Sequence, residues 1–370
     1  MINIPLSRPD IDEKDIQSVV EVLKTPYLSI GPKLTEFENK IADYVGREFA
    51  IGVNSGTSAL HLILKSLGIG ERDEVITTPF SFIASANCIL FERARPVFVD
   101  IEEETLNINP ELIEQAITER TKGILPVDVF GHPCDWDEII DIAQKNELYV
   151  IEDSCEALGS EYKGKKCGSF GVAAAFGFYP NKQITTGEGG MIVTDDEVLA
   201  NLCRSMRNQG RGEDMSWLNH ERLGYNFRMD EMSAALGLSQ LEKIEQILGM
   251  RSQVAHQYMM RLREIDEVTI QFIRNDVVMS WFVFVIRLKE GIDRDGVIEY
   301  LKKNGIASKP YFPPIHLQPF YIKQYGYKLG DFPVAERISN QCLALPFYNS
   351  LSNNEIDIIV DTLKEAIRLN

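Results

Sequence analysis

The sequence predicts an α/β protein with two domains, a large one over residues 1–248 with a mostly parallel sheet and a smaller α+β domain over residues 249–370. Three observations support this prediction. Apolar strand-like runs and amphipathic helix-like runs alternate along residues 73–153, which is the pattern of successive βαβ units. The pattern changes after Gly249. A chain of 370 residues also exceeds what one hydrophobic core ordinarily organises.

Two amphipathic helices and a strand–turn–helix segment open the chain. Apolar residues at helical spacing predict a helix over 10–24, ended by Pro26, and a second helix over 35–46. Residues 49–70 then give a short apolar strand, a glycine turn and a helix.

Regular alternation follows, and it predicts where a ligand binds. The predicted strands are 73–77, 96–100, 122–128, 148–153 and 191–195, and the predicted helices are 81–94, 110–119, 136–146, 197–208 and 230–248. Ligands of such sheets lie beyond the carboxyl ends of the strands. We therefore expect Thr57, Phe82, Asp153 and Lys182, which all follow predicted strands, to meet in one crevice.

The last third of the chain has a different organisation. A predicted strand over 277–288 and a helix over 294–305 precede a segment rich in proline and aromatic residues, 308–321, and two helices end the chain. We place the domain boundary near residues 245–250.

Composition excludes several classes of function. A net charge of −17 disfavours nucleic acid or an anionic membrane surface as a main partner, because both would repel the chain. Six cysteines without paired spacing indicate buried thiols in a reducing compartment, with neither a disulfide framework nor a metal site. No signal peptide or membrane span is evident, so we expect a cytoplasmic protein.

Lys182 is the residue on which the functional interpretation depends. It lies in a loop between two predicted buried strands, five residues before the run Gly187-Glu188-Gly189-Gly190. A lysine in a low-dielectric site becomes a usable amine nucleophile toward carbonyl groups, which favours a Schiff base with a bound aldehyde. The alternative is an ordinary solvated loop lysine.

A second candidate site follows the first predicted strand, at Asn54-Ser55-Gly56-Thr57-Ser58. Free backbone N–H groups and the helix dipole converge at a helix N-terminus, which makes it a suitable anion site. Simple capping by Ser55, Thr57 or Ser58 is the alternative. The segment is not a Walker loop, because no Gly-Lys-Ser/Thr follows.

Asp153 supplies a third element. A carboxylate at the end of a buried strand is costly without a cationic partner, and a protonated pyridine nitrogen is one such partner. With a phosphate site at residues 56–58, a flat ring at Phe82 and an amine at Lys182, the set describes pyridoxal phosphate (PLP). Separately, Asp153 could cap a helix and Phe82 could belong to the core.

Several segments together resemble one family. The segments are NSGTSAL (54–60), SFIASAN (81–87), EDSCEALG (152–159), the Lys182 loop with TGEGG, LGYNFRMDEMSAALG (223–237) and PYFPPIHLQP (310–319). They resemble the DegT/DnrJ/EryC1/StrS sugar aminotransferases from about Pro5 to the C-terminus. The resemblance implies the fold type I architecture of PLP-dependent transferases, with a mostly parallel sheet of the seven-stranded type flanked by helices.

The resemblance also implies roles for the cofactor residues. Lys182 matches the lysine that forms the Schiff base, and Asp153 matches the partner of the pyridinium nitrogen. The other matches are Glu156 beside the ring 3-hydroxyl, Gly56, Thr57 and Ser58 at the phosphate, Phe82 stacked on the ring, and Asn226 at the phosphate of a neighbouring subunit. A homodimer with shared active sites follows from the last match.

One position departs from the family pattern. Many members have a phosphate-binding serine five residues before the lysine, and this chain has Gly177 there. We expect weaker retention of the cofactor, without loss of activity.

The implied reaction is a ping-pong transamination. L-glutamate gives its amino group to the cofactor, leaving 2-oxoglutarate and pyridoxamine phosphate (PMP), and a keto-6-deoxy sugar on a nucleoside diphosphate then receives it. The candidate substrate residues are Tyr27, Ser29, Lys33, Tyr311, His316, Arg207 and Arg211. His316 could instead be a core or surface histidine, and the two arginines could be solvated.

A non-catalytic PLP-binding or regulatory member of the same family is the main alternative function. The dehydratase branch replaces the lysine with histidine, so Lys182 speaks against that branch. The sequence leaves open the nucleotide, the choice between amination at C3 and at C4, the stereochemistry and the pathway.

Overall fold

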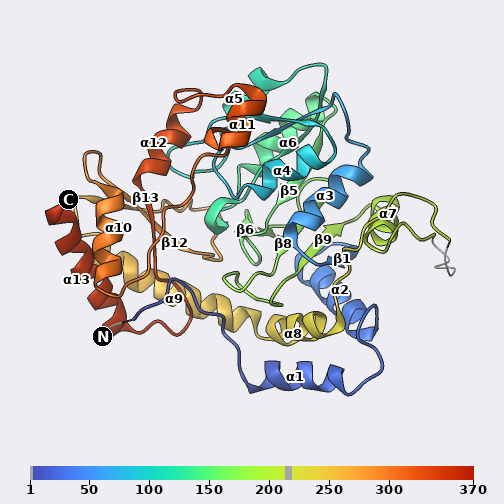
Figure 1. Ribbon diagram of the computed structural model, residues 1–370, viewed down its shortest axis with the longest axis horizontal. Coiled ribbons are helices and arrows are strands. Elements are labelled where there is room, and N and C mark those ends of the chain that lie inside the picture. The colour runs from blue at the N-terminus through green and yellow to red at the C-terminus, as the bar shows by residue number, and fades with distance from the viewer. Residues whose placement is uncertain (1–2, 213–218) are drawn as a thin grey trace.

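A computed structural model of the chain describes residues 3–212 and 219–370, and its centre is a seven-stranded sheet (Figure 1). The strand order is β1-β9-β8-β5-β4-β2-β3. All the neighbouring pairs from β8 to β3 are parallel, whereas β9 runs antiparallel to both β8 and β1. The prediction of a mostly parallel sheet is confirmed.

The strands and helices of this part of the chain largely follow the predicted order. The strands are β1 (Phe49–Val53), β2 (Glu74–Thr77), β3 (Arg95–Phe98), β4 (Thr121–Leu125), β5 (Tyr149–Asp153), β8 (Ala173–Gly177) and β9 (Gly190–Thr194). The helices are α1 (Glu13–Leu23), α2 (Pro32–Val45), α3 (Gly56–Ser66), α4 (Ala84–Phe91), α5 (Pro110–Ala116), α6 (Trp136–Lys145), α7 (Glu197–Arg207) and α8 (Glu231–Glu242).

Both faces of the sheet are buried, as alternation along β8 illustrates. Ala173 and Ala175 pack in the core that contains α3, while Ala174 and Phe176 pack in a second core with α2 and α8. Helices α5 and α6 contribute to a third core over β4 and β5. Because side chains alternate between the two faces of a strand, near-continuous apolar runs in the sequence correspond to strands covered on both sides.

Among the described residues, the rest of the chain forms two smaller sheets and further helices. One antiparallel sheet joins β10 (Val268–Ile270), β12 (Phe284–Leu288) and β13 (Cys342–Leu345), and the other joins β11 (Val277–Val278), β6 (Glu161–Tyr162) and β7 (Lys165–Lys166). The helices are α9 (Ile244–Leu262), α10 (Arg294–Lys303), α11 (Pro319–Tyr325), α12 (Pro333–Gln341) and α13 (Asn353–Leu369). Two 3₁₀ turns, Val129–Gly131 and Ile315–Leu317, complete the set. Figure 1 places α10 and α13 at the opposite end of the molecule from α7.

The region of the expected domain boundary differs from the prediction. The single helix predicted over 230–248 is two helices, α8 and α9, and α9 continues through Gly249 to Leu262. The expected boundary at residues 245–250 therefore falls inside a helix. The predicted strand over 277–288 is also divided, into β11 and β12. The division into two domains stays a prediction.

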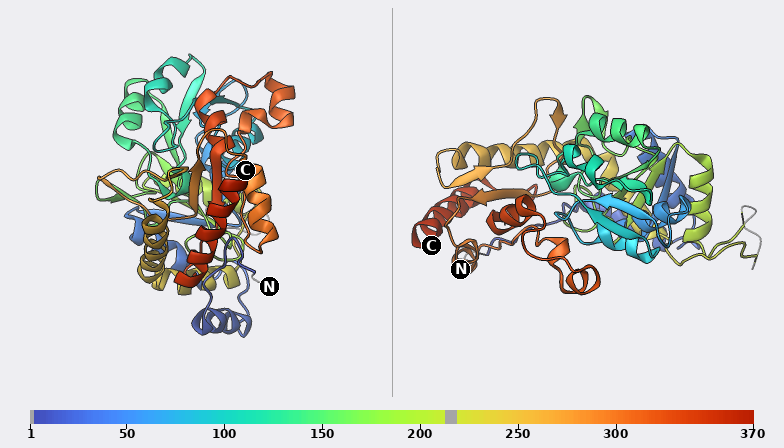
Figure 2. Two further views of the ribbon diagram at one scale, coloured as in Figure 1. Left: turned by 90° about the vertical axis from the view of Figure 1, so that its left-hand side faces the viewer. Right: turned by 90° about the horizontal axis from the view of Figure 1, so that it is seen from above.

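Helix α1 lies at the lower edge of the molecule, where its neighbour is α8 (Figure 1 and the left view of Figure 2). Asp12 and Asp15 accept hydrogen bonds from the Lys243 ammonium at 2.6 and 2.7 Å. Charged contacts therefore attach this helix to α8. None of the helices in the described ranges is both long and apolar enough to cross a lipid bilayer.

Candidate active site

A cavity of about 480 Å³ lies beyond the carboxyl ends of the parallel strands. Its lining includes Gly56, Thr57, Phe82, Asp153, Glu156, Gly177, Lys182 and Tyr311, all of them named in the sequence analysis. The four residues expected to meet in one crevice therefore line one cavity, as parallel strands predict.

Lys182 lies in the loop that connects β8 and β9, and its side chain is 14% exposed. Its Nζ is 3.6 Å from Glu156 Oε1 and 3.9 Å from the centre of the Phe282 ring. Burial raises the pKa of the Glu156 carboxyl, while the Lys182 ammonium and the Phe130 N–H act in the opposite direction. The amine therefore has one carboxyl and one aromatic face beside it.

Asp153 ends β5 and is 3% exposed. Its Oδ2 accepts a hydrogen bond of 2.7 Å from the Ser85 hydroxyl, and its Oδ1 accepts one of 3.2 Å from the Cys155 N–H. Within the described ranges, no lysine, arginine or histidine forms an ion pair with this carboxylate. A buried carboxylate with two donors and no cation has room for a cationic partner from the cavity.

The N-terminus of α3 reaches the same cavity. Ser55 caps the helix by accepting a hydrogen bond from the Ser58 N–H, and Ser55, Gly56 and Thr57 line the cavity. Ser58 does not, because its hydroxyl is directed to Asn54 Oδ1 at 2.7 Å. The contact of Ser58 with a phosphate stays a prediction, and the residue that caps the helix is Ser55.

Gly56 and Gly177 differ in the space around them. A Cβ on Gly56 would lie 2.7 Å from Cys155 Sγ, closer than real Cβ atoms approach. A Cβ on Gly177 would meet Cys155 only at 3.6 Å, an ordinary contact. The backbone at Gly56 therefore needs glycine, whereas Gly177 leaves room for a side chain.

Aromatic rings from distant segments form another part of the wall. Phe82 follows β2 and is 62% exposed, which leaves a ring face free at the cavity. Phe130 stacks on Phe312 with ring centres 5.3 Å apart, and Tyr311 contacts both. Burial raises the pKa of Tyr311 to about 12. The hydroxyl of Tyr311 therefore stays protonated at neutral pH.

Six of the seven candidate substrate residues lie outside this cavity, as does Asn226. Arg207 is buried and donates to Glu38 and to the Gly52 carbonyl, and His316 is fully buried with Nε2 3.0 Å from Glu336 Oε1. Both have partners within this subunit, and their contact with a substrate stays a prediction. Tyr27, Ser29, Lys33, Arg211 and Asn226 also lie away from the lining.

Sequence reasoning missed several residues of the site. Ser85 orients Asp153, Phe282 lies against Lys182, and Tyr179 and Asn181 complete part of the wall. Ser85 lies inside the quoted SFIASAN segment, so a hydroxyl at that position was a readable signal. Phe282 comes from the last third of the chain, and its spacing gives no sign of this contact.

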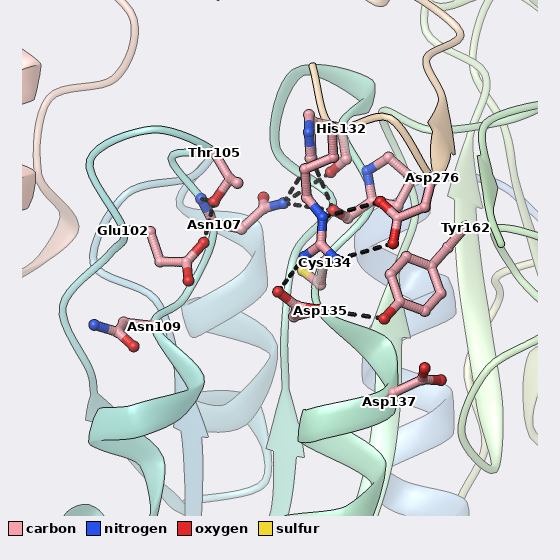
Figure 3. A network of polar contacts seen from close by, with 12 residues as sticks. Glu102, Thr105, Asn107, Asn109, His132, Cys134, Asp135, Asp137, Tyr162 and Asp276 are labelled. Atoms are coloured by element: carbon pink, nitrogen blue, oxygen red, sulfur yellow. Dashed lines mark hydrogen bonds and ion pairs between the residues drawn. The ribbon is translucent and has the colours of Figure 1, made fainter. Parts of the chain in front are cut away.

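A polar network attaches the segment that leads to Phe282. Arg274 donates to Asp135 and, at 3.0 Å, to Asp276, while the Tyr162 hydroxyl donates to Asp135 at 3.2 Å. Figure 3 shows Asp135, Tyr162 and Asp276 gathered there, with Asn107 beside His132. Strand β11 adds backbone pairing to β6. The chain is therefore anchored shortly before it reaches the cavity.

These residues fit pyridoxal phosphate. An amine, a buried carboxylate without a cation, a helix N-terminus and a free ring face correspond to its aldehyde, ring nitrogen, phosphate and pyridine ring. The Oδ1 atom of Asn181, also at the wall, is buried and has no hydrogen-bond partner in the described ranges. A bound group with a donor would satisfy it.

Comparison with known proteins agrees with this geometry. The model of the DegT/DnrJ/EryC1/StrS aminotransferase family matches residues 9–364. Spore coat polysaccharide biosynthesis protein SpsC of Bacillus subtilis is 39% identical over 99% of this chain and 97% of its own. GDP-perosamine synthase of Caulobacter vibrioides is 39% identical over 98% of each chain.

A solved structure extends the agreement to the whole fold. Spr1654 of Streptococcus pneumoniae in its PMP form superposes with a TM-score of 0.95, at 30% identity over 99% of this chain and 100% of that chain. The same protein has also been solved in a PLP form. A family match over almost the full length, together with relatives of this identity, establishes that the chain is a member of the DegT/DnrJ/EryC1/StrS aminotransferase family.

Proposed function

We propose that the protein binds PLP at Lys182 and transfers an amino group from L-glutamate to a nucleotide-linked keto-6-deoxy sugar. The observation that supports it best is that Lys182 and Asp153 line one cavity with the N-terminus of α3. These are the groups needed to anchor an aldehyde, hold a proton on a pyridine nitrogen and bind a phosphate.

Each side chain has one task in this proposal. Gly56 and Thr57 bind the phosphate, with Ser55 holding the helix start in place. Phe82 covers one face of the ring, and Asp153, oriented by Ser85, keeps a proton on the ring nitrogen. Glu156 lies beside the 3-hydroxyl.

Lys182 performs the proton transfer. When bound, PLP supplies an electron-withdrawing ring that stabilises the negative charge left when the substrate's Cα–H bond breaks. With the cofactor bound, the Lys182 amine would take that proton and hold it at Nζ, which lies 3.6 Å from Glu156 Oε1. The same amine would carry a proton again when the keto sugar is the substrate.

The sugar substrate is inferred from the relatives. GDP-perosamine synthase, 39% identical, is named for a GDP-linked product, and SpsC, also 39% identical, is named for polysaccharide biosynthesis. We expect the reaction in the cytoplasm, where nucleotide sugars are made.

We also propose a homodimer in which each site is completed by its partner. Ile16, Val20 and Leu23 lie exposed along α1, whereas Asp15 on the same helix is buried against α8. An amphipathic helix with its apolar side outward needs a cover, and a second copy of the chain supplies one. Asn226 is exposed and outside the cavity of its own chain, which suits contact with the partner's phosphate.

Complementation tests the shared site. Mixed dimers of Lys182→Ala and Asn226→Ala chains contain one site with both wild-type residues, so activity should reappear after the two inactive or weakened preparations are mixed and refolded together. If mixing restores nothing and Asn226→Ala alone is a fully active monomer, each site lies within one chain.

A substrate panel tests the function. Nucleotide-linked 3-keto and 4-keto 6-deoxy sugars, with glutamate as donor, are incubated with the cofactor-loaded protein and the products are weighed by mass spectrometry. We expect one sugar class to gain an amino group while 2-oxoglutarate forms. A protein that holds PLP and aminates none of these sugars would support the non-catalytic alternative.

A further inference from the structure

A chain of buried hydrogen bonds begins at the residue that follows Lys182. The Gln183 amide donates to the Glu156 carbonyl at 2.6 Å and to the Ser280 hydroxyl at 2.7 Å. The hydroxyls of Ser280 and Ser160 are 2.8 Å apart, and Ser160 donates to the Gly131 carbonyl at 2.6 Å. Gln183, Ser160 and Ser280 are all less than 5% exposed.

The Ser160 hydroxyl connects the two ends of this chain of hydrogen bonds. Gln183 uses its Nε2 hydrogens toward the Glu156 carbonyl and the Ser280 hydroxyl. The Ser160 hydroxyl is directed to Ser280 and to the Gly131 carbonyl, and it accepts a hydrogen bond from the Ser280 N–H at 3.0 Å. The three side chains therefore satisfy one another inside the protein.

The same three residues lie next to the groups that surround the Lys182 amine. Gln183 adjoins Lys182, and it holds the backbone of Glu156, whose side chain is fixed by the Phe130 N–H at 2.9 Å. Ser280 precedes Phe282 by two residues, and Phe282 is the ring 3.9 Å from Nζ. Four segments distant in sequence are thus joined around one amine.

We propose that Gln183, Ser280 and Ser160 position the groups around the Lys182 amine. Their hydrogen bonds, which we call the relay, hold Lys182, Glu156 and Phe282 in the relative positions that the reaction needs. The inference rests on the proposed role of Lys182. None of the three residues lines the cavity, so their effect reaches the cofactor through Lys182 and Glu156. A buried donor network of this kind fixes geometry that flexible loops alone would leave loose.

Substitution of Gln183 tests the relay. Gln183→Met keeps the size and removes both donors, leaving the Glu156 carbonyl without its partner. We expect the Kd for PLP added to cofactor-free protein to rise about tenfold, and the pH midpoint of the visible absorbance of the loaded protein to shift. Ser160→Ala should act in the same direction, and the double variant should cost no more than Gln183→Met alone.

A measurement without cofactor separates this inference from the proposed function. In cofactor-free protein, brief acetic anhydride treatment followed by peptide mass mapping compares labelling of Lys182 with that of exposed Lys165. Release of the loop by Gln183→Met should raise this ratio severalfold. If the wild-type protein takes up no PLP, the proposed function is contradicted. The labelling ratio of Lys182 to Lys165 still tests the relay in that case.

Thr194→Val is the matched control, because Thr194 is fully buried, donates to the Val172 carbonyl at 2.7 Å and lies outside the cavity lining. It should lower thermal stability while leaving the Kd for PLP within about twofold and the labelling ratio unchanged. The relay is wrong if Gln183→Met behaves like Thr194→Val, or if the effects of Gln183→Met and Ser160→Ala simply add.

Discussion

Two buried carboxyl sites share the end of β5 and differ in what surrounds them. Asp153 faces the cavity with two donors and no cation in the described ranges. Glu152, one residue earlier, points to the other side of the strand, where the Ser154 hydroxyl lies 2.6 Å from Glu152 and 2.7 Å from Asp128. The Phe170 N–H donates to Glu152, and the Cys134 N–H donates to Asp128.

We call the Glu152–Asp128 pair the closed site, because its carboxyl groups find hydrogen-bond partners within the protein. We call Asp153 the open site, because it lines the cavity. Ser154 has one hydroxyl hydrogen for two carboxyl oxygens, so one of the two carboxyl groups must carry a proton. Burial raises the pKa of Glu152 well above its ordinary value and raises that of Asp128 to about 6. Burial alone therefore does not distinguish the two sites; Asp153 differs in lining the cavity and in having fewer partners around its carboxylate.

The largest expected effect removes the amine that faces the open site. Lys182→Ala should lower turnover by about four orders of magnitude, because both the anchor and the proton carrier are lost. The chain should still bind PLP through the remaining contacts. Steady-state transamination measures the loss of turnover. The control is Lys165→Ala, because Lys165 is exposed. An unchanged rate would remove Lys182 from the mechanism.

Replacing each acid by its amide tests how Asp153 and Asp128 differ in their effect on turnover. Asp153→Asn should lower turnover about a hundredfold or more, because the amide no longer holds a proton on the ring nitrogen. Asp128→Asn should leave turnover within about threefold, since the new amide can donate to Ser154 while Ser154 donates to Glu152. Equal losses in the two variants would mean that the closed site also takes part in the chemistry.

The closed site should be visible in the pH dependence of stability. The folded pKa of Asp128, about 6, exceeds the unfolded value of about 3.9, so the folded state binds the extra proton between them. This stabilisation is complete below the unfolded pKa and is lost as the pH rises through the folded pKa. Urea unfolding measures the free energy of unfolding of wild type and of Asp128→Asn from about pH 5 to about pH 8. The value for wild type minus the value for Asp128→Asn should fall as the pH rises. A constant difference would contradict the shared proton.

The smallest effect concerns the phosphate end of the open site. Gly177→Ser fits, since its Cβ would approach Cys155 no closer than 3.6 Å, and its hydroxyl can reach the phosphate. PLP should bind up to about tenfold more tightly, measured by its loss during dialysis. Gly56→Ala is the opposite control, because its Cβ would lie 2.7 Å from Cys155 Sγ. Weaker binding in Gly177→Ser would place the phosphate elsewhere.

Local patterns predicted most of the sheet but failed where helices continue through a glycine. The alternation over residues 73–153 corresponds to real strands and helices. Strands and helices both place apolar residues toward the core, and each does so with its own spacing along the sequence. Helix α9 was missed beyond Gly249, although Val254, Tyr258 and Leu262 recur every fourth residue and are buried. A glycine inside a helix costs only about 1 kcal/mol, which the burial of these side chains outweighs.

The candidate site was predictable where residues follow strand ends, and much less so elsewhere. Lys182 and Asp153 meet because the topology brings the carboxyl ends of their strands to one edge. The partner of His316, Glu336, was not predictable, because it is 20 residues away and no local pattern reveals the pair. Phe282 and Ser280 come from a segment whose position depends on Arg274, Asp135 and β11.

Covalent trapping of the cofactor tests whether Lys182 is the residue that binds PLP. The protein is loaded with PLP, reduced with borohydride, digested and mapped by mass spectrometry. We expect a single pyridoxyl adduct on the peptide that contains Lys182, and its disappearance in Lys182→Ala. An adduct on another lysine, or a protein that takes up no PLP while folded, would contradict it.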